Sequence, residues 1–79
     1  PEGRLLVAKF FTSDCFVCKS LHPKIKQIAA ENPDVLWAKL NGSDPELVDL
    51  FHTLGVKAVP LFHFVRDGQL VSELSASLN

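Results

Sequence analysis

The only two cysteines of this chain stand close together in the segment Cys15-Phe16-Val17-Cys18. An apolar run precedes them and a helical pattern follows them, so we expect Cys15 at the N-terminus of a helix. Backbone N–H groups and the helix dipole favour a thiolate over a thiol at that position. A thiolate is the attacking species in disulfide exchange, and Cys18 would be within reach to displace the product. The spacing therefore favours redox chemistry.

The segments on either side of the cysteine pair predict a strand and a helix. Leu5–Phe11 is apolar apart from Lys9, which is typical of a central buried strand. After Cys18, apolar residues recur every three or four positions, so we expect an amphipathic helix. Asn32-Pro33 should end this helix, and Pro23 lies inside it.

The second half of the chain predicts three further strands and one short helix. Ser43 and Glu46 form a capping-box pattern around Pro45, and Gly55 suits a left-handed helix end. A tight turn is expected at residues 66–69. The predicted elements are a strand at Val35–Leu40, a helix at Pro45–Thr53, and strands at Leu61–Val65 and Gln69–Leu74.

The order βαβαββ predicts an α/β fold with a mixed four-stranded sheet and helices on both faces. Two right-handed crossovers would place the first three strands parallel, and the closing hairpin would add an antiparallel edge. Sites in such sheets form beyond the carboxyl ends of the parallel strands. Cys15 follows the first strand and should emerge there.

Composition and length limit the classes of function. The 79 residues fit a single domain spanning 1–79, and 47% hydrophobic with 22% charged residues argues against disorder. A formal net charge of -1 with interspersed signs favours neither nucleic acid nor an anionic membrane as a partner. No apolar run approaches the roughly 20 residues that span a bilayer. Because the chain begins at Pro1 without a leader, we interpret it as processed or excised.

Motifs along nearly the whole chain resemble the thioredoxin family. They comprise the first strand leading into Cys15-x-x-Cys18, then Lys19, Pro23, Ala38-Lys39-Leu40-Asn41, Gly55-Val56, Val59-Pro60 and the hairpin Phe64-Val65-Arg66-Asp67-Gly68-Gln69. Within the family, four segments resemble the atypical Cys/His-rich plastid thioredoxins of plants and algae. These are Phe10-Phe11, Lys19-Ser20-Leu21-His22-Pro23-Lys24, Asn32-Pro33-Asp34-Val35 and Leu61-Phe62-His63-Phe64.

The resemblance implies a fold, an activity and partners. The fold would be thioredoxin-like, lacking the family's first strand-helix unit and last helix, so that apolar sheet surface is left uncovered. Cys15 would attack a target disulfide and Cys18 would resolve the mixed disulfide, with no dissociable cofactor because the two thiols carry the electrons. Partners would be disulfide-containing target proteins and a thiol or thioredoxin-reductase-type electron donor. The location would be the plastid stroma, or otherwise the cytoplasm.

The resemblance also assigns a turn that binds substrate. Val59-Pro60 matches the family's cis-proline turn, which would face the cysteine pair and leave an unpaired backbone edge beside the sulfurs. Val59 would then hold a substrate segment by strand-like pairing.

Several residues depart from the family pattern and should modulate the site. Asp14 replaces a tryptophan and should raise the pKa of Cys15 if its carboxylate points toward the sulfur, while Phe16 and Val17 replace Gly-Pro and present an apolar surface. Lys9 stands where the family buries an aspartate, and Lys39 matches the lysine that partners it. Because desolvation and repulsion lower a lysine pKa, we expect one ammonium group to be neutral near pH 7 or to reach solvent.

Two other functions remain open. Cys18 and His22 have metal-ligand spacing, but a closed zinc site needs four ligands and the sequence offers no fourth. The chain is alternatively a thioredoxin-like binding or regulatory module with weak or no turnover. We interpret His22, His52 and His63 as surface or packing residues, and Trp37 as packed beside the second strand.

Overall fold

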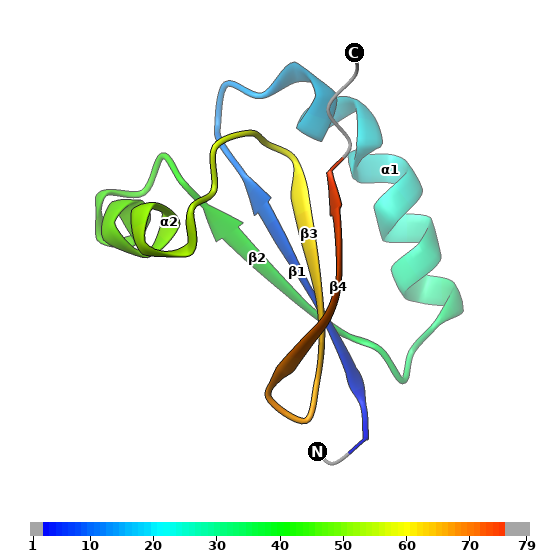
Figure 1. The fold of residues 1–79 in the computed structure, drawn as a ribbon. Coiled ribbons are helices and arrows are strands. Elements are labelled where there is room, and N and C mark those ends of the chain that lie inside the picture. Colours follow the sequence, from blue (N-terminus) through cyan, green and yellow to red (C-terminus); the bar gives the residue numbers. More distant parts are fainter. Residues whose placement is uncertain (1–2, 76–79) are drawn as a thin grey trace.

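A computed structural model describes residues 3–75 of the chain and contains a four-stranded sheet with two α-helices (Figure 1). The order βαβαββ is confirmed, with a short 3-10 turn, η1, before the second helix. The elements are β1 Leu5–Phe11, α1 Phe16–Glu31, β2 Leu36–Asn41, η1 Pro45–Leu47, α2 Val48–Leu54, β3 Leu61–Arg66 and β4 Gln69–Ser75. Neither described helix is long and apolar enough to cross a membrane.

The strand directions differ from the prediction at β3. The sheet order is β2-β1-β3-β4, and β1 runs parallel to β2 but antiparallel to β3. The expectation that the first three strands are parallel is therefore wrong. The connection explains why: α2 has 7 residues, about 10 Å of helix, whereas the 6 residues of β2 extend about 20 Å. α2 therefore does not carry the chain back along the sheet, and β3 starts at the end where β2 finished.

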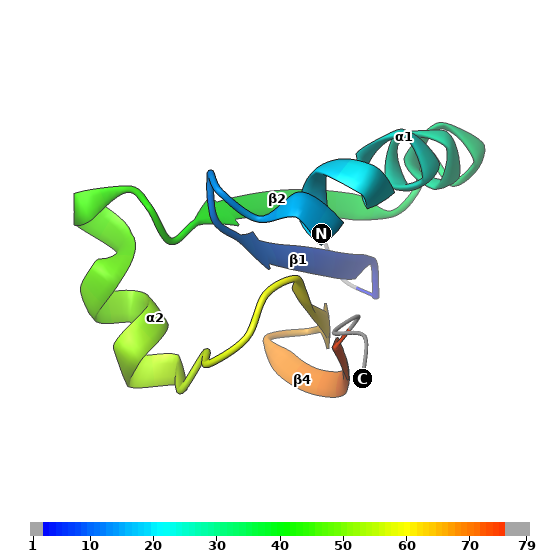
Figure 2. The same ribbon diagram turned by 90° about the horizontal axis from the view of Figure 1, so that it is seen from above.

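The two helices pack on opposite faces of the sheet (Figure 2). Successive residues of β1 alternate between the faces, so Val7 and Lys9 lie under α1 while Ala8 and Phe10 lie on the side of α2. Phe51 of α2 meets the Phe10 ring edge to face, with 5.4 Å between the ring centres. This contact is the centre of the main apolar core.

The start of α2 differs from the predicted capping box. Asp44, not Ser43, caps η1, because the Asp44 carboxylate accepts a hydrogen bond of 2.9 Å from the backbone N–H of Glu46. Ser43 instead accepts a 3.0 Å hydrogen bond from the backbone N–H of Ser13. The predicted end is confirmed, since Gly55 has φ 70°.

The closing hairpin turns at Asp67 and Gly68, which have φ 52° and 77°. Positive φ at both central residues matches the right-handed twist of the strands. Strand β4 then forms an exposed edge of the sheet, where Leu70, Val71 and Leu74 are each more than half exposed. Apolar surface is therefore uncovered on β4, as the sequence predicts.

We predict that Gly42→Ala destabilises the fold. A Cβ atom at residue 42 would lie 2.6 Å from Cε2 of Phe51, and moving that ring disturbs its contact with Phe10. Overpacking of this kind costs about 1–3 kcal/mol in the free energy of unfolding, measured by urea denaturation. In a Phe51→Leu background, which makes room, Gly42→Ala should cost much less. Equal costs in both backgrounds would show that this contact is not responsible.

Candidate active site

The two cysteines form a disulfide at the first turn of α1. Cys15 is the N-cap residue, as expected, and its sulfur accepts a 3.0 Å hydrogen bond from the backbone N–H of Cys18. The two Cα atoms are 5.2 Å apart. Cys15 is partly exposed whereas Cys18 is only 3% exposed, so a partner from solvent reaches Cys15 more readily.

The segment between β1 and α1 is held by the loop that follows β2. The Ser13 hydroxyl accepts a 3.1 Å hydrogen bond from the Asn41 side-chain amide, and the Ser13 backbone N–H donates to the Ser43 hydroxyl. The backbone N–H of Gly42 donates a 2.7 Å hydrogen bond to the carbonyl of Phe11. These contacts join the carboxyl ends of the two parallel strands and so fix where α1 and its disulfide begin.

The Val59–Pro60 peptide bond is cis, as predicted. Since Leu61 pairs with Phe10, this turn lies at the same end of the sheet as the disulfide. The Pro60 ring is fully buried, and Val59 packs against the apolar core. Outside the helices and strands, none of the backbone hydrogen bonds among residues 3–75 involves Val59. Its backbone is thus available for the strand-like pairing that the sequence predicts, and that role stays a prediction.

The outer side of the disulfide is apolar. Phe16 is 80% exposed, Val17 is partly exposed, and Asp14 is exposed on the preceding turn. The predicted apolar surface between the cysteines therefore exists, because the ring of Phe16 projects from the first turn of α1 rather than packing on the sheet.

Behind the disulfide, Lys9 is buried with only 4% of its surface exposed. Lys39 is its neighbour in the parallel register and is exposed. Burial, followed by repulsion from Lys39, lowers the pKa of Lys9 below the usual lysine value. Lys39 is thus the lysine that reaches solvent, and Lys9 is the one whose charge is disfavoured. Its ammonium group lies 5.4 Å from the centre of the Phe11 ring.

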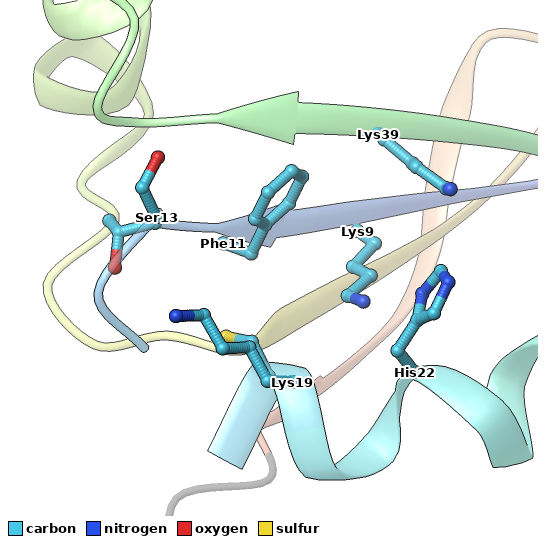
Figure 3. Close-up of a pocket in the computed structure, with 8 residues that line it drawn as sticks. Lys9, Phe11, Ser13, Lys19, His22 and Lys39 are labelled. Atoms are coloured by element: carbon cyan, nitrogen blue, oxygen red, sulfur yellow. The ribbon is translucent and has the colours of Figure 1, made fainter. Parts of the chain in front are cut away.

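His22 belongs to the same cluster, although its sequence pattern predicts only a surface or packing residue. A cavity of about 290 Å³ lies between β1, β2 and α1 (Figure 3). It is lined by Lys9, Phe11, Thr12, Ser13, Cys18, Lys19, His22 and Lys39. Partial desolvation and then the charges of Lys39, Lys9 and Lys26 lower the pKa of His22. The signal was available, because residues 19, 22 and 26 share one face of a helix.

His63 does not line this cavity. Within residues 3–75, no group of three or more His, Cys, Asp or Glu side chains is placed to hold a metal ion. His63 lies on β3 and its Nε2 is 2.8 Å from a carboxylate oxygen of Glu73 on β4. Its ring also meets the Phe10 ring at 4.8 Å between centres, so His63 is a packing residue.

We predict that the stability of the fold depends on pH through Lys9. Because the pKa of Lys9 is lowered in the folded state, burying its charge destabilises the protein fully below that pKa. This destabilisation is lost as pH rises from the lowered pKa of the folded state to the ordinary lysine pKa of about 10.4 in the unfolded state. Lys9→Met should therefore be more stable than the parent at pH 7, and the difference should shrink as pH rises toward 10.

Urea denaturation from pH 7 to 10 would check this. Lys57→Met is the matched control, since Lys57 is exposed and the variant also loses one ammonium group. A shift of the same size and pH dependence in Lys57→Met would contradict the role of burial.

Comparison with known proteins places this geometry in a family. The family model described as Thioredoxin matches residues 2–79. "Thioredoxin-like 1-2, chloroplastic" from Arabidopsis thaliana is 44% identical over 66 residues, which are 84% of this chain and 26% of that protein. The chain thus spans about a quarter of the length of that relative.

Solved structures of thioredoxins resemble this chain as well. Thioredoxin of Fasciola hepatica superposes with a TM-score of 0.84 at 35% identity, covering 94% of this chain and 69% of that one. A chain of the complex between ferredoxin:thioredoxin reductase and thioredoxin f2 superposes at 0.85 with 26% identity, covering 94% of this chain and 66% of its own length. The arrangement of the helices and strands is therefore that of a known fold, and this chain belongs to the thioredoxin family.

Proposed function

We propose that this chain is a thiol–disulfide oxidoreductase that exchanges electrons with disulfides of target proteins. The observation that carries the proposal is the asymmetry of the Cys15–Cys18 disulfide at a helix N-terminus. Cys15 is partly exposed to solvent, whereas Cys18 is buried.

The reaction follows from this asymmetry. In the reduced protein, the Cys15 thiolate attacks one sulfur of a target disulfide, which forms a mixed disulfide and releases one target thiolate. Cys18 then attacks the Cys15 sulfur, which restores the Cys15–Cys18 disulfide and releases the second target thiolate. Two electrons pass to the target, and both come from the cysteine pair, so no dissociable cofactor takes part.

Local structure favours the charged form of Cys15. The backbone N–H of Cys18 donates to its sulfur, and a charge-assisted hydrogen bond is stronger than a neutral one. The positive end of the α1 dipole acts in the same direction. Val59, with its backbone outside any strand, would align a target segment beside the sulfurs.

The relatives suggest where the protein works and what reduces it. The Arabidopsis relative is named chloroplastic, and one structural neighbour was solved with ferredoxin:thioredoxin reductase. We infer a plastid protein that works in the stroma and is reduced by a reductase of that class.

Insulin reduction driven by dithiothreitol tests the activity. Cys15→Ser should abolish the rate above the dithiothreitol background, because the attacking sulfur is gone. Cys18→Ser should accumulate a covalent mixed disulfide, seen by non-reducing gel electrophoresis, because nothing resolves it. Parent and Cys15→Ser rates that are equal would refute the enzyme and favour the binding or regulatory module.

Phe16 should contribute to recognition of protein targets. It is 80% exposed beside the reactive sulfur, so a docked protein would bury its ring. We predict that Phe16→Ser raises KM for a protein disulfide about threefold to tenfold, in line with a contribution of about 1 kcal/mol. The rate with a small disulfide such as dithionitrobenzoate should hardly change.

Leu70→Ser is the matched control. Leu70 is an exposed apolar residue next to the hairpin turn, at the opposite end of the sheet from the disulfide (Figure 1). If Leu70→Ser raised KM as much as Phe16→Ser, the recognition surface would not be centred on Phe16.

A further inference from the structure

Two adjoining cavities behind the disulfide make one cleft, called the basic cleft below. The first has a volume of about 290 Å³, and the second, of about 250 Å³, continues along β2 and α1. Lys9, His22 and Lys39 line both cavities. Lys19 lines the first and Lys26 the second, whereas no Asp or Glu lines either of them. The chain as a whole has a net charge of -1, so this gathering of positive charge is local.

The ammonium group of Lys9 has no anionic partner in the cleft. Lys9 is 4% exposed, and among residues 3–75 the only ion pair is between His63 and Glu73. Figure 3 shows its Nζ directed into the space between β1 and α1, toward His22. An ammonium group has three hydrogens to donate, and its charge is costly in a largely buried side chain unless it is paired. Lys9 therefore has donors that an anion in the cleft would satisfy.

Trp37 of β2 lies in the same region of the structure. Its Nε1 is buried and has no hydrogen-bond partner within the described part of the chain. An indole N–H is a donor only, and buried donors without partners are rare. Trp37 lines the same cavity as Lys9 and Lys39. Because this nitrogen is buried, it does not reach the surface of the cleft, and the donors that face an anion there are those of Lys9, His22 and Lys39.

We propose that the basic cleft is a binding site for a tetrahedral oxyanion, a phosphate ion or the phosphate group of a small monoester. Several oxygens on one small anion match donors that converge from β1, β2 and α1. The volume is ample for phosphate together with the body of a small monoester. Side chains of Phe11 and Ala29 give part of each wall an apolar character.

The site would be linked to the disulfide, a consequence that rests on the proposed function. Cys18 lines the first cavity, so a bound anion lies on the buried side of the sulfur pair. The negative charge of the anion disfavours a thiolate at Cys18. It also offsets the positive charges of the lysines, which favour that thiolate. In the equilibrium between disulfide plus two glutathione and dithiol plus glutathione disulfide, phosphate should therefore shift the protein toward the disulfide. By linkage, the oxidised protein binds phosphate more tightly.

Titration of the oxidised 79-residue chain with inorganic phosphate tests the site directly and needs no redox turnover. The chain is kept in a zwitterionic buffer at pH 7 with ionic strength held constant by sodium chloride. We expect one saturable event by calorimetry and a matching shift of the indole ¹H–¹⁵N resonance, which is unambiguous because the chain has one Trp. Glycerol 3-phosphate forms the second arm, and tighter binding than phosphate would identify a monoester site.

Variants decide whether Lys9 holds the anion. Lys9→Met should weaken phosphate binding about tenfold or more, since a charge-assisted hydrogen bond contributes about 1.5–3 kcal/mol. His22→Gln, on an exposed residue of α1, should weaken it less and keeps the proposal testable if Lys9→Met does not fold. Lys57→Met should bind as the parent does. Absence of saturation, an unmoved indole resonance, or equal weakening by Lys57→Met would overturn the site.

The redox consequence has its own measurement. Saturating phosphate should lower the equilibrium constant for reduction by glutathione at least twofold in the parent and leave that of Lys9→Met unchanged. If phosphate binds but the equilibrium constant does not move, the link to the disulfide is wrong. Failure of insulin reduction with intact phosphate binding would count against the proposed function alone.

Discussion

Strand β1 pairs with a neighbouring strand along both edges, and its two-residue alternation determines what lies on each face of the sheet. Ala8 and Phe10 enter the core with Phe51, and this packing fixes the register of the strand. Because Lys9 lies between Ala8 and Phe10 in the strand, its side chain must lie on the opposite face, under α1. A one-residue shift in the register of β1 would move Lys9 to the other face but would also remove Phe10 from the core. The packing of the apolar face therefore keeps the charged side chain of Lys9 buried on the opposite face.

The same constraint brings the site together. The end of β1 is tied to the loop after β2 through Phe11, Ser13 and Asn41, and the start of β3 pairs beside it. The disulfide, the cis-proline turn and the basic cleft therefore all depend on where one strand ends. Because α2 is too short to return along the sheet, β3 begins at this end as well. The short connection thus places Val59 at the same end of the sheet as the cysteines.

Local patterns in the sequence are sufficient to predict the helices and strands, but they do not predict how distant segments are arranged relative to one another. β1 was predicted with its observed bounds, and the end of α1 at Asn32 and the left-handed Gly55 follow from single-residue preferences. The direction of β3 depends on the length of a connection relative to a strand, which helix and strand patterns do not encode. Ser43 was misplaced because Ser13, distant in sequence, competes for its hydroxyl. His22 was missed for a related reason, since its partners Lys9 and Lys39 lie on strands and only the fold sets them opposite α1.

The two sides of the disulfide have different surroundings. One side therefore determines how targets are recognised, and the other determines the redox equilibrium of the cysteine pair. Phe16, on the outer side, meets whatever docks, while Cys18 on the inner side faces the lysines of the basic cleft. A substitution at residue 16 changes contact area but adds no charge near the buried sulfur. One at residue 9 changes the field behind Cys18 but is out of reach of a docked protein, because Lys9 is covered by α1. Recognition and redox equilibrium can therefore vary independently, even though both act through one pair of sulfur atoms.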